Sequence, residues 1–347
     1  MNKKYILLTG AAGYIGSHTL LQFLNANFNV ISLDSYINSS EAALEKVKLL
    51  SGRDFITIVG DVADESLLED LFSTYTISLV VHLASFKSVE QSTLEPLNYF
   101  HNNVSATVSL LRIMNKYEVF NFIYSSSATV YGSQVSNPIS ENAILGLATN
   151  PYGCSKKVVE DMLFQLQMAE PRWSIACLRY FNPVGAHESG LIGEDPTGVP
   201  SNLLPYIQQV AIGKLDYLKI YGNDYPTIDG TGVRDYLHVM DLADGHVSVA
   251  DHMLNTDSCF NVWNLGTGQG YSVLQIVNAF QEINQIAVPY QIVDRRAGDV
   301  PEVWADVSKI RSDIGWKSQY SLSDMMESAW NWQNKNPNGY SDPPKLV

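Results

Sequence analysis

Hydrophobic and polar residues alternate in a strand-then-helix order along the first half of the chain. Short apolar runs predict buried strands near residues 5–9, 28–33, 55–59, 78–84, 120–125 and 174–179. Longer stretches with apolar residues at helical spacing lie between them, near 14–26, 40–50, 64–75, 95–116 and 152–169. This alternation predicts an α/β fold with a doubly wound parallel sheet.

The pattern changes after the sixth predicted strand. From Phe181 to Pro200 the chain is rich in Gly, Pro and polar residues, which we interpret as the passage into a second domain. We therefore place the main domain over 1–180 and a smaller C-terminal α/β domain over 181–347. Segments near 236–265 contain a helix and an apolar strand, and we expect them to return to the main domain.

A glycine-rich turn, Gly10 to Gly16, joins the first predicted strand to the first helix. In this setting Gly10 makes the tight turn, Gly13 lets the backbone approach a pyrophosphate, and Gly16 lets the helix and strand pack closely. The helix N-terminus offers free N–H groups and a positive dipole end to the phosphates. An ordinary tight turn is the competing interpretation, but the spacing favours a Rossmann-type dinucleotide site.

An acidic residue, Asp34, ends the second predicted strand. A carboxylate at this position can accept hydrogen bonds from a ribose diol and would repel a 2′-phosphate. The sequence therefore favours NAD over NADP.

Tyr152 and Lys156 form a pair at helical spacing, after a plausible cap and first turn at Asn150 and Pro151. Residues four apart lie on the same face of a helix. A free phenol has a pKa of about 10, and we expect the Lys156 ammonium to lower that of Tyr152. Such a base suits the removal of a proton from an alcohol while a hydride leaves the same carbon.

Three serines, Ser125 to Ser127, end the fifth predicted strand. Ligands bind outside the carboxyl ends of strands in such sheets, so a hydroxyl there can bond a substrate oxygen and relay a proton to a tyrosine. A polar exit from the strand would explain the serines alone, but Tyr152 follows Ser127 by 25 residues.

The composition excludes some partners and locations. The chain has 347 residues, 46% of them hydrophobic, and a net charge of −14, which argues against nucleic acid or an anionic membrane as partner. Cys154, Cys177 and Cys259 show no paired or metal-type spacing, and no stretch is apolar for long enough to span a membrane. We therefore expect a cytoplasmic protein.

The histidines and tryptophans predict packing rather than ligand binding. His82, His187 and His238 form no metal-binding motif, so we predict no metal site and assign them to packing or capping. We assign to the core the tryptophans Trp263, Trp304, Trp316, Trp330 and Trp332.

Six motifs occur in order along nearly the whole chain. They are Thr-Gly-x-x-Gly-Tyr-Ile-Gly-Ser-His at 9–18, Ser-Ser-Ser-Ala-Thr-Val-Tyr-Gly at 125–132, Tyr-Gly-x-Ser-Lys at 152–156, Leu-Arg-Tyr-Phe-Asn-Pro-Val-Gly-Ala-His at 178–187, Gly-Asn-Asp-Tyr-Pro-Thr at 222–227 and Asp-Gly-Thr-Gly-Val-Arg-Asp-Tyr at 229–236. With them the chain resembles the extended short-chain dehydrogenase/reductases and, through the last three, the UDP-glucose 4-epimerase family within them.

The resemblance implies an isomerase that interconverts UDP-glucose and UDP-galactose with a tightly held NAD. Tyr152 would take the proton of the sugar 4-hydroxyl, bridged by Ser127, while a hydride passes from C4 to the nicotinamide. The 4-keto sugar would then turn over, and the returning hydride would invert C4. Lys156 would also bond the nicotinamide ribose. A homodimer is implied as well.

The resemblance also implies the residues that contact each ligand. For NAD, besides the glycines, Asp34, Tyr152 and Lys156, they are Tyr14, Ile15, Asn38, Asp61, Val62, Leu83, Ala84, Lys87, Asn102, Tyr180 and Pro183. For the UDP-hexose they are Lys87, Ser127, Thr129, Tyr152, Asn182, Asn202, Leu203, Tyr221, Arg234, Arg296, Asp299 and Val303. Guanidinium groups match phosphate oxygens, although Arg234 and Arg296 could equally form surface ion pairs, and Asp299 could pair with Arg295.

The chain departs from this family at three positions. Ser85 and Glu90 stand where family members usually have glycine, which would matter if either needed a positive φ or close approach to NAD. Val303 replaces a common tyrosine beside the sugar, and the extra room leads us to hypothesise that N-acetylated UDP-hexoses are also accepted.

Two other function classes remain as alternatives. A 4,6-dehydratase would need an acidic residue in the serine motif, where this chain has Ala128 and Thr129; a UDP-uronate epimerase is a related alternative. A non-catalytic NAD-binding regulator would typically lack the tyrosine and the lysine, and both are present.

Overall fold

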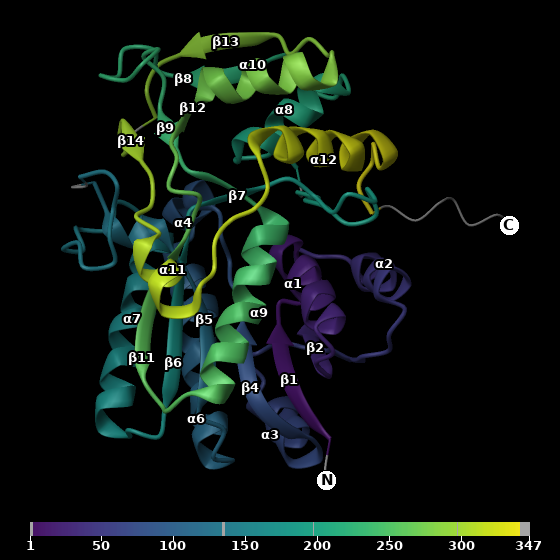
Figure 1. Ribbon diagram of the computed structural model, residues 1–347, viewed down its shortest axis with the longest axis vertical. Coiled ribbons are helices and arrows are strands. Elements are labelled where there is room, and N and C mark those ends of the chain that lie inside the picture. Colours follow the sequence, from purple (N-terminus) through teal and green to yellow (C-terminus); the bar gives the residue numbers. More distant parts are fainter. Residues whose placement is uncertain (1–2, 134–135, 197, 297, 341–347) are drawn as a thin grey trace, which may run out of the picture.

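A seven-stranded parallel sheet forms the centre of the larger half of the molecule (Figure 1). The computed structural model describes residues 3–133, 136–196, 198–296 and 298–340. The strands are β1 (Lys4–Thr9), β2 (Val30–Asp34), β3 (Ile56–Val59), β4 (Thr76–His82), β5 (Asn121–Ser127), β6 (Ser174–Tyr180) and β11 (Phe260–Leu265). Their order, β11-β6-β5-β4-β1-β2-β3, reverses between β1 and β4. Ligands bind at such a switch point, which places the site at the ends of these two strands.

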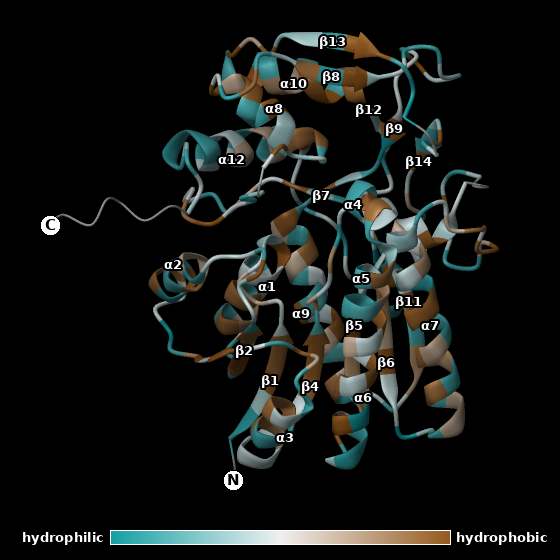
Figure 2. Cartoon of the chain, turned by 180° about the vertical axis from the view of Figure 1, so that it is seen from behind, coloured by the Kyte–Doolittle hydropathy of each residue, from teal (hydrophilic) through white to brown (hydrophobic). Residues whose placement is uncertain are grey.

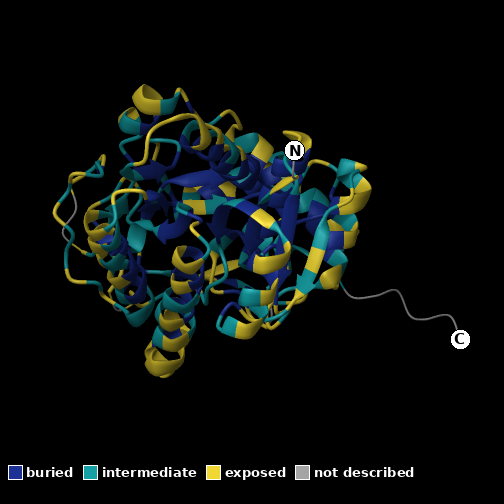
Figure 3. Ribbon diagram, turned by 90° about the horizontal axis from the view of Figure 1, so that it is seen from below, coloured by how far each residue is buried: buried dark blue, intermediate teal, exposed yellow. Residues whose placement is uncertain are grey.

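Helices cover both faces of the sheet because its strands are apolar on both sides. In β1, Ile6 and Leu8 point into one core and Leu7 into the other, as the two-residue period of a strand requires. The first core contains α1 (Tyr14–Asn25), α2 (Glu41–Ser51), α9 (Val239–Asn255) and α11 (Ser308–Ile314). The second contains α3 (Glu65–Thr74), α6 (Ala106–Lys116) and α7 (Pro151–Ala169). Apolar strands and a buried centre are visible in Figures 2 and 3. The predicted doubly wound fold is confirmed.

One predicted helix is interrupted. The stretch 95–116 consists of α5 (Pro96–Phe100), a π-helical turn η1 (His101–Ser105) and then α6. A separate short helix, α4 (Val89–Leu94), precedes it and was not predicted. The Ser88 hydroxyl caps α4 by accepting a bond from the Gln91 N–H at 3.2 Å. Pro96 separates the two helices, because the residue before a proline is disfavoured in helical geometry.

The smaller half has its own core and only short strands. These strands are β7 (Asn182–Val184) with β10 (Tyr236–His238), β8 (Leu218–Tyr221) with β13 (Tyr290–Val293), and β9 (Val233–Arg234) between β12 (Tyr271–Ser272) and β14 (Glu302–Val303). The helices α8 (Leu203–Ala211), α10 (Val273–Asn284) and α12 (Leu322–Lys335) pack around them. Figure 1 shows this half above the ends of the sheet.

The chain passes more than once between the two halves. β11 pairs with β6 at the edge of the large sheet, and α9 packs against α1. This arrangement agrees with the prediction that the segment 236–265 returns to the main domain. The domain boundaries themselves, 1–180 and 181–347, stay a prediction.

The buried aromatic residues support the packing interpretation in part. Trp263, Trp316 and Trp332 are buried, whereas Trp304 and Trp330 are only half-buried. Among the helices of the described residues, none has the length and apolar character that a membrane crossing requires.

Candidate active site

The glycine turn has a backbone that only glycine can form at two positions. Gly10 has a φ of +70°, and a Cβ there would lie 2.7 Å from the backbone nitrogen of Ala84. A Cβ on Gly16 would lie 2.0 Å from the Gly10 carbonyl oxygen, so α1 packs directly on the turn. Gly13 precedes α1 without a side-chain cap, and no acidic residue lies in the first turn. These free N–H groups and the close backbone fit a pyrophosphate.

Asp34 holds the second strand end against the glycine turn. Its buried carboxylate accepts bonds from the Ala12 N–H at 2.8 Å, the Tyr36 N–H at 3.0 Å and the Ser39 hydroxyl at 2.7 Å. A carboxylate has further lone pairs, so the same group can also accept from a ribose hydroxyl. Asp34 thus fits its predicted cofactor role, and it also caps the loop after β2, which is the competing interpretation of this residue from sequence.

The loop after β4 lies beside the glycine turn and is bonded to the end of β1. The Leu83 N–H donates to the Thr9 carbonyl oxygen at 3.2 Å, and the Ala84 N–H to the Thr9 hydroxyl at 3.3 Å. The Asn102 side chain, in η1, accepts from the Phe86 N–H at 3.1 Å. Leu83, Ala84 and Asn102 therefore lie together beside the turn.

The other predicted NAD contacts vary in exposure. Tyr14 and Ile15, in the first turn of α1, are half-buried, as is Pro183. Val62 is buried next to an exposed Asp61, and Asn38 is exposed. The buried Tyr180 bonds His246 Nε2 through its hydroxyl at 2.5 Å. The cofactor roles of these residues stay predictions.

The predicted catalytic groups meet where β5 and α7 approach. The Asn150 side chain caps α7 by accepting from the Gly153 N–H at 2.8 Å, which confirms the predicted cap. Tyr152 shares a hydrogen bond with Ser127. The Ser127 hydroxyl also accepts from the Thr129 hydroxyl at 3.0 Å. Ser127 therefore links two hydroxyl groups, as a proton relay requires.

Lys156 is one of the most buried cations in the described chain, with 2% of its surface exposed. Its ammonium lies 5.9 Å from the Tyr152 ring centre and 5.0 Å from that of Tyr124. Burial lowers the pKa of Lys156 to about 7, while Glu160 acts in the opposite direction. A change of charge near neutral pH is typical of groups at catalytic sites.

The prediction that Lys156 lowers the pKa of Tyr152 is wrong for the chain without a bound ligand. Burial raises the pKa of Tyr152 to about 12, and the hydrogen bond with Ser127 offsets only part of this rise. The reason is that removing a phenolate from water disfavours its charged form more than the contact with Ser127 favours it.

An ion pair joins the two halves of the molecule beside the turn. Lys87 Nζ lies 2.8 Å from Glu194 Oε1, with the Glu194 side chain only 9% exposed. Glu194 also accepts a bond from the predicted substrate residue Asn202 at 3.2 Å. The Tyr14 hydroxyl donates to the Gly185 carbonyl oxygen nearby, at 2.6 Å. The role of Glu194 was not predicted, because its partner Lys87 is 107 residues away.

Several of the predicted UDP residues lie on the short strands of the smaller half and in the loop between β13 and β14. Arg234 lies opposite Val303 in the register of β9 and β14, and its guanidinium is 3.8 Å from Asp299. The guanidinium of Arg296 lies 4.4 Å from the Tyr221 ring centre. Arg234, Arg296, Asp299 and Tyr221 are thus neighbours in space.

The alternative pairing of Asp299 with Arg295 is wrong. Arg295 instead donates to Asp224 at 2.7 Å, and its guanidinium lies 4.1 Å from the Tyr225 ring centre. Asp299 stands by Arg234, so it stays available for a ligand hydroxyl. Of the remaining predicted residues, Asn182 and Asn202 are exposed and Leu203 is half-buried.

Two buried carboxylates support the site and were not predicted. Asp235 accepts from the Thr267 and Gly268 N–H groups at 2.8 and 2.9 Å and from the Ala305 N–H at 3.1 Å. Glu160 pairs with the equally buried Arg179 at 2.6 Å. Glu160 follows Lys156 by four residues, so helical spacing could have found it; nothing local marks Asp235.

The departures at Ser85 and Glu90 introduce no backbone strain. Among the described non-glycine residues, positive φ occurs at Asn27, Tyr36, Glu118 and Gln285. Glu90 is exposed in the first turn of α4, and Ser85 contacts Lys156.

Histidine side chains near the site are engaged in packing and capping. His82 lies between the Thr9 and Thr107 hydroxyls, at 2.8 and 3.0 Å. His238 caps α9 by accepting from the Met240 N–H. His187 bonds Ser189 at 2.8 Å.

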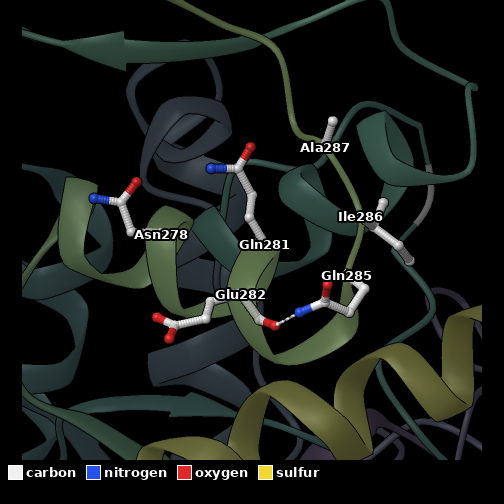
Figure 4. A pocket seen from close by; sticks show the side chains of 6 residues that line it. All are labelled: Asn278, Gln281, Glu282, Gln285, Ile286 and Ala287. Atoms are coloured by element: carbon white, nitrogen blue, oxygen red, sulfur yellow. Dashed lines mark hydrogen bonds between the residues drawn. The ribbon is translucent and has the colours of Figure 1, made fainter.

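A separate hollow of about 470 Å³ lies at the C-terminal end of α10 (Figure 4). It is lined by Asn278, Gln281, Glu282, Gln285, Ile286 and Ala287. The Gln285 amide there donates to the Glu282 carbonyl oxygen. This hollow contains none of the predicted site residues, so we do not connect it with the chemistry.

The chain is similar to known proteins over nearly its whole length. The family model described as GDP-mannose 4,6 dehydratase matches residues 7–329. The UDP-glucose 4-epimerase of Pasteurella multocida (strain Pm70) is 50% identical over 97% of this chain and 99% of its own length.

Solved structures of UDP-glucose 4-epimerases are also similar to this chain. The UDP-glucose 4-epimerase from Bifidobacterium longum, in complex with NAD+ and UDP, has a TM-score of 0.93 at 49% identity, covering 96% of this chain and 99% of its own. The enzyme from Stenotrophomonas maltophila, with bound NAD and formylated UDP-arabinopyranose, has a TM-score of 0.94 at 43% identity, covering 97% and 99%.

Proposed function

The chain belongs to the UDP-glucose 4-epimerase family, and we propose that it interconverts UDP-glucose and UDP-galactose as an NAD-dependent isomerase. The single observation that carries the proposal is the meeting of Tyr152, Ser127 and Lys156 at the carboxyl end of β5. This is the edge of the sheet at which the glycine turn offers its free N–H groups.

The chain's own residues divide the work of one reversible step. Tyr152 accepts the proton of the sugar 4-hydroxyl, through the Ser127 hydroxyl to which it is bonded. NAD bound along the glycine turn supplies the oxidant that takes and returns the hydride. Lys156 places positive charge beside Tyr152. Tyr152 returns its proton to the sugar 4-oxygen, while the inversion at C4 would come from return of the hydride to the other face of that carbon.

The substrate must stay bound while its sugar turns over. Arg234 and Arg296 are placed to hold the diphosphate, since guanidinium groups form paired bonds with phosphate oxygens. Asp299, next to Arg234, is placed for a uridine-ribose hydroxyl. With the anchor on the nucleotide, the hexose is free to present either face to Tyr152.

The elimination chemistry of a 4,6-dehydratase is disfavoured. Such an enzyme needs an acid near the serine motif, and the positions after Ser127 are Ala128 and Thr129. The Thr129 hydroxyl is bonded to Ser127. The site therefore has the groups for oxidation and reduction but lacks an acid there to expel water.

One assay separates these functions. Purified protein is given UDP-galactose with no added NAD, and the products are resolved by chromatography. Formation of UDP-glucose supports the proposal. A product that has lost water would indicate a dehydratase, and no reaction, with added NAD as well, would indicate a non-catalytic NAD-binding protein.

We further propose that N-acetylated UDP-hexoses are substrates. Val303 is half-buried on β14, opposite Arg234. A valine leaves more room beside the sugar than an aromatic ring. Turnover of UDP-N-acetylglucosamine should be comparable with that of UDP-glucose, and a rate below about a hundredth of it would contradict this breadth.

We also propose a cytoplasmic homodimer. Apolar side chains are exposed on α4, α5 and α7, which contact one another: Val89, Leu94, Leu97, Val158, Phe164 and Met168. Exposed apolar patches of this kind mark interaction sites, and a second copy would cover them. Sedimentation at a single monomer mass would contradict the dimer. The location rests on composition alone.

A further inference from the structure

The ammonium of Lys156 is held by one serine on β5 and one serine in the loop after the neighbouring strand β4. It donates to the Ser125 carbonyl oxygen at 2.7 Å and to the Ser85 hydroxyl at 2.9 Å, with the Ser125 hydroxyl further away at 3.3 Å. Ser125 belongs to β5, and Ser85 lies in the loop after β4. The cation thus spans the gap between the two strand ends and α7.

Other groups around Lys156 cannot replace these contacts. Glu160, on the same helix, is already paired with Arg179 at 2.6 Å and bonded by the Ser126 hydroxyl. His82, on β4, is buried, and burial lowers its pKa to about 3, so it adds no charge. Tyr124 and Tyr152 present ring faces to the ammonium.

We propose that Ser85 is a positioning residue: its hydroxyl holds the Lys156 ammonium at the junction of β4, β5 and α7, beside Tyr152. A buried ammonium needs hydrogen-bond acceptors to keep its proton. The Ser125 carbonyl oxygen belongs to the backbone and is present in any sequence, whereas the Ser85 hydroxyl belongs to a side chain and depends on this residue. The inference rests on the proposed role of Tyr152 as base.

The consequence concerns the protonation of the base. When Ser85 is removed, Lys156 loses an acceptor and its charged form becomes less favourable. The phenolate of Tyr152 then has less positive charge beside it, and a higher pH is needed to form it. The substrate anchors Arg234 and Arg296 lie on other elements and are unaffected.

The test compares Ser85→Ala with the wild type in kcat and KM for UDP-galactose from about pH 6 to about pH 10. We expect kcat at neutral pH to fall about tenfold, KM to change less than about twofold, and the acid limb of the kcat profile to move to higher pH. Ser85→Thr, which keeps a hydroxyl, should restore the wild-type profile. Ser85→Gly should behave as Ser85→Ala.

Two controls make the result specific. Ser88→Ala removes the α4 cap in the same loop without touching Lys156, and its profile should match the wild type. An equal shift in Ser88→Ala, or a Ser85→Ala profile that superimposes on the wild type, would overturn the proposal. Full activity of Tyr152→Phe would refute the proposed base and this inference together, whereas an unshifted Ser85→Ala alone leaves the base in place.

Discussion

The two sides of the active site are constructed in different ways. On the predicted NAD side, backbone atoms dominate. The Gly10–Gly16 turn packs closely against α1 and the β4 loop, and the buried Asp34 accepts bonds from three donors. On the UDP side, side chains form the predicted surface: Arg234, half-buried, lies on the two-residue strand β9, and the exposed Arg296 lies in the loop after β13. Arg296 lies over Tyr221, and Arg234 stands 3.8 Å from Asp299.

This difference matches the different fates of the two ligands. A cofactor that is retained through every turnover benefits from a rigid backbone surface that loses no entropy on binding. A substrate that must turn between two half-reactions is better held at its nucleotide by long, adjustable side chains. We therefore expect changes on the NAD side to affect stability and retention, and changes on the UDP side to affect mainly KM.

The largest effect is expected where the two sides meet, at Tyr152. Tyr152→Phe removes the hydroxyl that exchanges the proton with Ser127, and general-base groups contribute roughly 10²- to 10⁴-fold. The kcat for UDP-galactose should fall by that factor while NAD stays bound. Steady-state rates, with absorbance of the bound cofactor as the control for retention, check this. Epimerase turnover at the wild-type rate would refute the assignment.

Acid should unfold the NAD side through its buried histidines. Burial lowers the pKa of His18, in α1, and of His82, in β4, to about 3. The unfolded chain takes up these protons below about pH 6.5, so it binds more protons than the folded chain between the two values. The free energy of unfolding should therefore fall with decreasing pH, by up to about 1.4 kcal/mol per unit for each histidine.

Urea unfolding at a series of pH values measures this slope. His82→Asn, which can still bond the Thr9 and Thr107 hydroxyls but does not titrate, should reduce the slope. If the free energy of unfolding depended equally on pH in His82→Asn and in the wild type, His82 would not contribute to the acid sensitivity.

Substitution by alanine should affect the stability of the fold differently at Gly13 and at Gly16. Gly16→Ala places a methyl 2.0 Å from the Gly10 carbonyl oxygen and should destabilise the fold by about 3 kcal/mol. Gly13→Ala meets that oxygen at an ordinary 3.4 Å, so the fold should keep its stability within about 0.5 kcal/mol. Its methyl should nevertheless weaken NAD binding, because the backbone approaches the pyrophosphate there.

Urea unfolding and the fraction of NAD retained through purification separate the two roles of these glycines. Similar stability losses in Gly13→Ala and Gly16→Ala would show that the turn is not divided in this way.

The smallest effect is expected on the UDP side. Arg234→Ala and Arg296→Ala should each raise KM for UDP-galactose about tenfold, through loss of charged hydrogen bonds, with little change in kcat. Arg295→Ala is the matched control, since Arg295 is bonded to Asp224 instead. An equal rise in KM for Arg295→Ala would mean that general positive charge, rather than specific anchoring, acts on the substrate.

Local spacing was enough to predict the parts of the site that lie close together in sequence. The glycine turn follows β1 directly, Tyr152 and Lys156 share one helix, and Ser127 ends a strand. Each of these depends on helix or strand periodicity over a few residues, so the sequence carries the information. The interruption at 101–105 was missed, because a single π-helical turn is rare and too short to change the helical pattern of the whole stretch 95–116.

The contacts between distant residues were decided by the tertiary structure. Ser85 reaches Lys156 across 71 residues, and Lys87 reaches Glu194 across 107. The sequence by itself determined the parallel sheet, the glycine turn after β1 and the position of Tyr152 and Lys156 one helical turn apart, through local periodicity. The packing of β4, β5 and α7 decided which serines hold the cation and that burial raises the pKa of Tyr152, since desolvation depends on everything packed around a group.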